Sequence, residues 1–122
     1  MTLAYLECAL WASLDNADES GGEPLDANYG LEDFAPETLK EAAEECAQFA
    51  ADAAEDLERS DASLEQVGHD FFLTRNRHGT GFWDRGDEHY PADVRRRLTE
   101  AAHAWGTWEP YVGDDGRLYS NG

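Results

Sequence analysis

The sequence has few cysteines and no long apolar run. Its two cysteines, Cys8 and Cys46, belong to neither a CxxC nor a CxxH motif, which argues against a disulfide framework and against a zinc site. We expect both thiols to be reduced core residues of a cytoplasmic protein. No run of about eighteen apolar residues occurs, so no membrane span is expected. The first residues, MTLAYLECALW, contain Glu7 and no basic side chain, and they predict no signal peptide.

Basic residues are scarce as well. The chain has nine Lys and Arg against 27 Asp and Glu, which gives a formal net charge of −18. The imbalance is concentrated in residues 1–68, which contain 18 acidic and two basic side chains, whereas residues 69–122 contain nine and seven. An electrostatic field of this sign repels nucleic acid and anionic membranes, and it attracts basic surfaces.

The composition is otherwise typical of a folded protein. Hydrophobic residues make up 41% of the 122 residues and aromatic residues 11%, whereas a disordered acidic tail would have few aromatics. A chain of this length can bury a core without metals or disulfides. We therefore predict a single domain over residues 1–122.

Several segments have the apolar spacing of helices. Residues 3–13 predict a short helix with Leu3, Leu6 and Leu10 in apolar contacts, although the aromatic residues there leave a strand open. Residues 36–59 predict the longest helix, because proline suits a first helical position, and residues 91–105 predict another that begins at a proline. Residues 61–67 predict one or two helical turns that Gly68 ends. Residues 13–30 are rich in Asp, Asn, Ser, Gly and Pro and predict a loop.

The predicted helix at residues 36–59 has two unlike sides. At 100° per residue one arc is apolar and consists of Leu39, Ala42, Ala43, Cys46, Phe49, Ala50, Ala53 and Leu57. The opposite arc contains seven carboxylates, namely Glu37, Glu41, Glu44, Glu45, Asp52, Glu55 and Asp56. At a rise of ~1.5 Å per residue this row is roughly 28 Å long, with one carboxylate per ~4 Å. The row is interpreted either as a solvated helix face or as a binding surface.

The stretch GHDFFLTRNRHGTGFWDRG at residues 68–86 predicts a β-hairpin. Residues 69–75 alternate in the manner of a strand, with Phe71 and Leu73 on one side, and Asn76 and Gly79 suit a turn. Residues 107–112 and 117–119 predict a second hairpin around the turn GDDG. Together these elements predict an α+β fold, in which a small antiparallel β-sheet of three to four strands packs against two or three helices.

Residue types that carry chemistry occur without a recognisable arrangement. Side chains of the types that bind metals or transfer protons are present at His69, Asp70, His78, Asp84 and His89. Their spacing matches no metal or acid–base signature. No serine lies in a GxSxG context, and the glycines of residues 68–86 do not precede a helix as a phosphate loop would. We therefore expect no enzyme activity, no metal and no cofactor. The cluster Arg95, Arg96 and Arg97 is expected to pair with the acidic half of the chain.

Four stretches resemble a family of small acidic proteins that bacteriophages and prophages encode, mostly without an assigned function. The stretches are ALWASLD at 9–15, GEPLDANYGLEDFAPETL at 22–39, GHDFFLTRNRHGTGFWDRG at 68–86 and YVGDDGRLY at 111–119. The resemblance covers nearly the full length, and the motif at 68–86 is specific. It implies a phage origin and a bacterial cytoplasmic setting, and it supplies no catalytic residues.

Size, charge and the lack of an active-site signature lead to a hypothesis about function. We expect a phage-encoded acidic inhibitor, of the anti-CRISPR or antirestriction kind, that imitates DNA and binds the basic groove of a host DNA-handling protein. The carboxylate row would form the binding surface, extended in the loop by Asp15, Asp18, Glu19 and Glu23. The alternative is a phage accessory or structural protein that binds a partner through the aromatic residues of 68–86, with its acidity serving solubility or a host of high internal salt.

Overall fold

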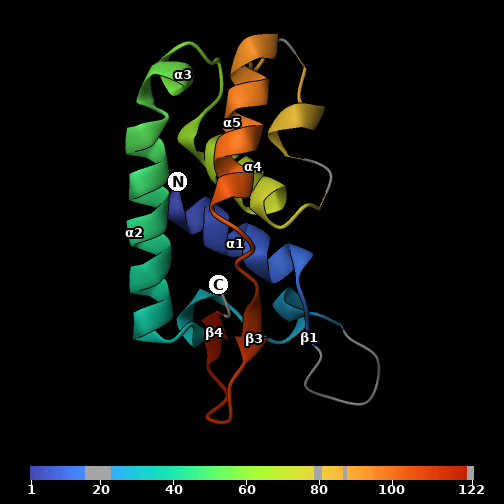
Figure 1. Cartoon of the computed structure of the whole chain (residues 1–122). Helices are drawn as coiled ribbons and strands as arrows, with labels where there is room; N and C mark the ends of the chain where they lie inside the picture. The colour runs from blue at the N-terminus through green and yellow to red at the C-terminus, as the bar shows by residue number, and fades with distance from the viewer. Residues whose placement is uncertain (16–22, 79–80, 87, 121–122) are drawn as a thin grey trace.

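Most of the regular structure is helical. The computed structural model describes residues 1–15, 23–78, 81–86 and 88–120. Its α-helices are α1 (Thr2–Ala12), α2 (Pro36–Asp52), α3 (Ala54–Glu58), α4 (Leu64–Arg75) and α5 (Ala92–Ala104), arranged as in Figure 1. Single 3-10 turns are present at η1 (Leu25–Ala27), η2 (Leu31–Asp33) and η3 (Phe82–Asp84). No helix among the described residues is long and apolar enough to cross a membrane.

Among the described residues, extended structure consists of two short antiparallel pairs and an isolated bridge between Phe34 and Leu118. Strand β1 (Leu14–Asp15) pairs with β2 (Glu23–Pro24), and β3 (Pro110–Val112) pairs with β4 (Leu118–Ser120). The predicted hairpin near the C-terminus is therefore confirmed, and its turn ends at Gly116, whose φ of +80° favours glycine. The predicted α+β fold with a sheet of three to four strands is wrong, because the fold is mostly helical.

The first error lies in residues 68–86, whose first half is helix α4 and not a strand. Ser63 begins this helix, because its side chain accepts a hydrogen bond from the backbone N–H of Gln66 at 3.1 Å. From Asp70 to Arg75 every residue of α4 is buried. A helix that is buried all round shows no polar face, so its sequence has no helical period and a short apolar run is easily taken for a strand.

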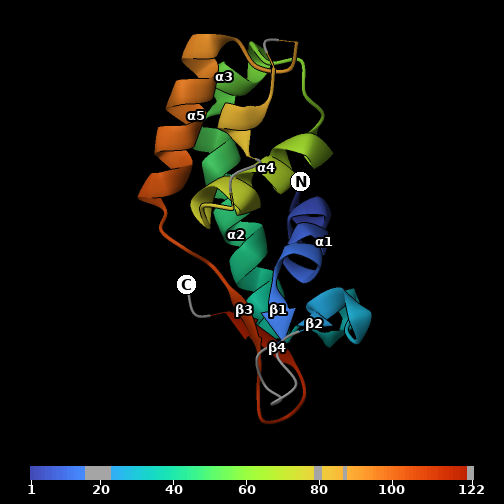
Figure 2. The same cartoon turned by 90° about the vertical axis from the view of Figure 1, so that its right-hand side faces the viewer.

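Gly68 does not end a helix, as the sequence predicts, but lies inside α4. An added Cβ would overlap the carbonyl oxygen of Met1 and lie 3.1 Å from the backbone nitrogen of Tyr5. The glycine therefore lets α1 cross α4 at close range. In Figure 2, which turns the molecule by 90°, α4 lies between α1 and α5, and both of these helices contact it.

The remaining helix predictions are confirmed, with one change. The helix predicted at residues 3–13 is α1, shifted by one residue to Thr2–Ala12, and the helix that begins after Pro91 ends before Gly106, whose φ is +74°. The predicted helix at residues 36–59 is interrupted at Ala53, so that it forms α2 and α3. The start of α2 is joined to the C-terminal hairpin, because the N–H of Ala35 donates to the carbonyl of Leu118 at 3.0 Å.

Aromatic rings form the centre of the core. Tyr5 of α1 lies 5.2 Å from Trp108, and Phe49 of α2 stacks on Phe71 of α4 at 4.1 Å between ring centroids. Phe72 and Phe82 are fully buried beside them. The phenylalanines of residues 68–86 therefore build the core and are not available to a partner, whereas Trp83 of the same stretch is 59% exposed, so that the alternative hypothesis stays a prediction for this one aromatic residue.

The two cysteines are core residues, as predicted. Both are buried and free, and burial raises the pKa of Cys8 to about 12 and that of Cys46 to about 11, from an ordinary 9.0. Because the thiolate is the nucleophile, such pKa values lower the reactive fraction at pH 8 about a hundredfold or more. We expect iodoacetamide to label both thiols at least that much more slowly in the native protein than in urea, as followed by mass spectrometry. Rapid labelling of the native protein would contradict the buried positions.

Candidate functional site

The predicted carboxylate row does not lie on one outer face of α2. The buried stripe of α2 consists of Thr38, Ala42, Cys46 and Phe49, whereas Leu39 and Ala43, which we expected to be buried, are exposed. The helix is thus rotated about its axis relative to the predicted arc. This rotation brings part of the predicted outer row toward the core.

Glu41 and Glu45 are the residues that the rotation moves inward. A carboxylate oxygen of Glu41 accepts a hydrogen bond from the indole N–H of Trp108 at 2.6 Å and another from the hydroxyl of Ser120. The carboxylate of Glu45 pairs with the guanidinium of the buried Arg75 at 3.1 Å. Both side chains therefore hold the fold together and are not free to meet a partner.

Asp56 is also engaged within the molecule. Arg97 of α5 donates to its carboxylate from two nitrogens, the shorter bond being 2.7 Å, and joins α3 to α5. Arg97 and Arg59 both bind Asp93, and these hydrogen bonds lower the pKa of the Asp93 carboxyl to about 2. For Arg97 the predicted pairing with the acidic half is confirmed. Arg95 instead donates to the carbonyl of Arg85 at 2.6 Å.

Four of the predicted residues remain exposed on α2 and α3. We call them the outer carboxylates: Glu37, Glu44, Asp52 and Glu55. Helix α2 forms one flank of the molecule, at the left of Figure 1. Glu37 and Glu44 are two helical turns apart, or ~10 Å at ~1.5 Å per residue, so the row is sparser than predicted. Lys40 lies 3.9 Å from Glu44 and is a weak local counter-charge.

The loop carboxylates cannot be added to this surface. Asp18 and Glu19 lie outside the described residues, and Asp15 and Glu23 lie in strands β1 and β2, where only the backbone is described. These four predicted site residues stay predictions.

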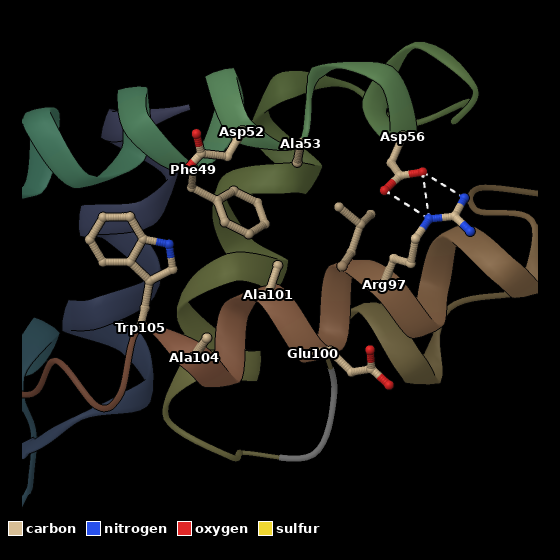
Figure 3. A pocket seen from close by; sticks show the side chains of 10 residues that line it. Phe49, Asp52, Ala53, Asp56, Arg97, Glu100, Ala101, Ala104 and Trp105 are labelled. Carbon is tan, nitrogen blue, oxygen red and sulfur yellow. Dashed lines mark hydrogen bonds and ion pairs between the residues drawn. The ribbon is translucent and has the colours of Figure 1, made fainter.

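A groove lies beside the outer carboxylates, between α2–α3 and α5 (Figure 3). It has a volume of about 780 Å³. Phe49 and Trp105 face the hollow from either side in Figure 3, and the Asp56–Arg97 pair lies at one end. Asp52, one of the outer carboxylates, also lines it. The groove can therefore take an apolar group next to a negative charge.

The candidate metal ligands of residues 69–89 are not brought together. Asp70 is buried and accepts hydrogen bonds from Gln66 at 2.9 Å, Arg85 at 2.9 Å and the hydroxyl of Tyr90 at 2.8 Å. Burial, with the Asp70 carboxylate beside it, raises the pKa of Tyr90. By contrast, His78 and Asp84 are exposed. No group of three His, Cys, Asp or Glu side chains within the described residues is arranged to hold a metal ion.

The comparisons with known proteins give no independent guide. No family model, no curated protein and no solved structure matches the chain. The resemblance to small acidic phage proteins therefore stays a prediction. Inferences about function rest on the geometry described above.

Proposed function

We propose that the chain is an acidic inhibitor that binds the basic groove of a DNA-handling host defence protein, such as a CRISPR effector or a restriction enzyme. The setting is the cytoplasm of a bacterium infected by the phage that encodes it. The inhibitor imitates DNA through its negative electrostatic field and through the outer carboxylates. It binds protein and does not contact nucleic acid itself.

The observation that carries this proposal is where the basic side chains lie. Arg75, Arg85 and Arg97 pair with Glu45, Asp70 and Asp56, which are buried or half-buried carboxylates. These arginines therefore neutralise inner charges, and among the described residues exposed carboxylates outnumber the exposed basic side chains, which are Lys40, Arg59, Arg77, Arg96 and Arg117. Within the described residues no ion pair reaches Glu37, Asp52 or Glu55. A negative flank of this kind, on which Lys40 is a weak counter-charge beside Glu44, attracts a basic groove from a distance.

The groove beside the outer carboxylates adds a way to hold the partner's basic side chains. Lysine and arginine bury their aliphatic stems on apolar surface while the charged head stays polar. Ala101 and Ala104, which are exposed, and the partly buried Trp105 give the groove an accessible apolar lining for such a stem, and the exposed Asp52 lines the same groove and can pair with the head. The outer carboxylates then need not reproduce the spacing of DNA phosphates, because the long side chains of the partner can adjust to the positions of the carboxylates.

Neutralising the outer carboxylates tests the proposal. The variant Glu37→Gln, Glu44→Gln, Asp52→Asn, Glu55→Gln is expected to bind the target at least about tenfold more weakly, since four exposed charge pairs at a few tenths of a kcal/mol each amount to roughly 1.4 kcal/mol. Binding is measured by surface plasmon resonance against the protein that the wild type captures from a bacterial lysate. The loss is expected to shrink as salt rises, because salt screens exposed charges.

A second variant controls for total charge. Glu32→Gln, Asp84→Asn, Glu88→Gln and Asp114→Asn remove the same number of exposed carboxylates elsewhere, and this variant is expected to bind more tightly than the first. Equal affinity of the wild type and the first variant would contradict the proposal. It would favour the alternative that the acidity serves solubility or a host of high internal salt, and unfolding of the protein at low salt would support the latter.

A further inference from the structure

We propose that a trough along the seam of α1 and α4 is a second contact surface, which binds a basic amphipathic segment of a partner protein. Different residues carry this inference, so it does not rest on the outer carboxylates or on DNA mimicry. We call the surface the α1 trough and define it by the following residues: Leu3, Glu7, Trp11, Asp26, Glu65 and His69.

The trough consists of two adjoining hollows. One has a volume of about 480 Å³ and includes Trp11, Leu10 and Asp26, and the other has about 460 Å³ and includes Leu3 and Glu65. Glu7 and His69 line both hollows. The two therefore adjoin at these side chains and lie along α1, in contrast to the separate groove between α2–α3 and α5.

Large apolar side chains are exposed along the trough. Leu3 is 64% exposed and Trp11 is 60% exposed, although the sequence predicts that Leu3 makes apolar contacts. The two lie eight residues apart on α1 and hence on similar sides of the helix, with ~12 Å of rise between them. Leu64, at 61% exposed, begins α4 next to Glu65 but is not among the residues that line either hollow. Clustered exposed apolar side chains indicate an interaction site, and tryptophan is frequent at the centres of binding interfaces.

The charges around these apolar groups specify the kind of partner. Glu7, Asp26 and Glu65 are exposed, and neither hollow has a lysine or an arginine among the described residues that line it. A segment with leucine or phenylalanine on one face and lysine or arginine beside it complements both features. A second copy of this chain or an anionic membrane does not, because each would bring further negative charge.

A designed peptide tests the trough directly. The probe is a 14-residue helical peptide (about 21 Å at ~1.5 Å per residue) made of leucine and lysine, and its matched partner carries glutamate in place of each lysine. Each is titrated into ¹⁵N-labelled protein at roughly physiological ionic strength, where distant charges are screened. The leucine–lysine peptide is expected to bind and to shift the indole N–H signal of Trp11 and the amide signal of His69. The leucine–glutamate peptide is expected not to bind.

Matched variants locate the binding. The double variant Leu3→Ser, Trp11→Ala is expected to bind the leucine–lysine peptide about tenfold more weakly, as the loss of a central aromatic contact implies. Tyr111→Ala removes an aromatic residue of similar exposure on β3 and is expected to bind as the wild type does. In the variant without the outer carboxylates, the leucine–lysine peptide is still expected to shift the Trp11 indole signal. A failure of this inference can therefore be distinguished from a failure of the proposed function. Circular dichroism confirms that each variant is folded.

Three results would overturn the inference. Equal affinity of the wild type and the Leu3→Ser, Trp11→Ala variant for the leucine–lysine peptide would mean that the peptide binds through charge elsewhere. Binding of both peptides alike, or of neither, would show that the trough does not select a basic segment. A wild-type dimer that the double variant dissociates, as seen by sedimentation, would assign the trough to a second copy of the chain.

Discussion

Replacing Asp70 with alanine is expected to lower the free energy of unfolding by about 3 kcal/mol, since removal of one member of a buried ion pair typically costs about 3–5 kcal/mol. The carboxylate is fully buried and accepts hydrogen bonds from Gln66, Arg85 and Tyr90. Without it the hydroxyl and the guanidinium lose their acceptor. The loss lies at the lower end of the range, because Arg85 is one-third exposed and can be rehydrated.

Urea unfolding followed by circular dichroism measures this loss. Asp84→Ala is the matched control, because Asp84 belongs to the same stretch of sequence but is exposed. It is expected to change the free energy of unfolding by about 0.5 kcal/mol or less, as surface substitutions usually do. Similar small losses in both variants would mean that Asp70 is not the buried acceptor described above.

Replacing Arg75 with methionine is expected to cost about 3–5 kcal/mol, because it leaves a largely buried carboxylate unpaired. Arg75 is 2% exposed and donates to Glu45, the hydroxyl of Tyr5 and the carbonyls of Trp105 and Gly106. Its guanidinium also lies 5.2 Å from the centroid of the Phe71 ring. One side chain of α4 thus holds α1, α2 and the end of α5 together.

A double variant separates the ion pair from the packing. Arg75→Met with Glu45→Met is expected to recover part of the stability that Arg75→Met loses, because the unpaired carboxylate is then absent. Arg96→Met, which changes an exposed arginine of α5, is the control and is expected to be nearly neutral. A double variant no more stable than Arg75→Met would contradict the pairing of Arg75 with Glu45.

Local sequence patterns were sufficient to predict a helix where that helix has one buried side and a clear start. Helices α2 and α5 bury one residue at every third or fourth position and begin at or just after a proline, so their periodicity is visible. Helix α4 lacks that signal, because its second half, Asp70 to Arg75, is buried all round and because Gly68 resembles a helix end. Only the crossing of α1 at Gly68 explains the glycine, and that contact joins residues more than sixty positions apart.

The prediction that all seven carboxylates lie on one outer helix face is wrong for a similar reason. Whether Glu41 and Glu45 face solvent depends on Trp108 and Arg75, which lie 67 and 30 residues away in the sequence. Periodicity along α2 cannot reveal such partners. Nothing in the sequence indicates that Leu3 and Trp11 are exposed, because both fit an apolar helix face.

Competition with DNA is the most direct test of the proposed DNA mimicry. The wild-type protein is immobilised and exposed to a bacterial lysate, so that it captures its partner. A duplex oligonucleotide is then added to the complex as the competitor. We predict that duplex DNA releases the captured protein, and that the variant without the outer carboxylates captures much less of it. Retention of the captured protein at a saturating concentration of duplex DNA would contradict the proposal, because the partner's DNA-binding groove would then not be the site that this acidic surface occupies.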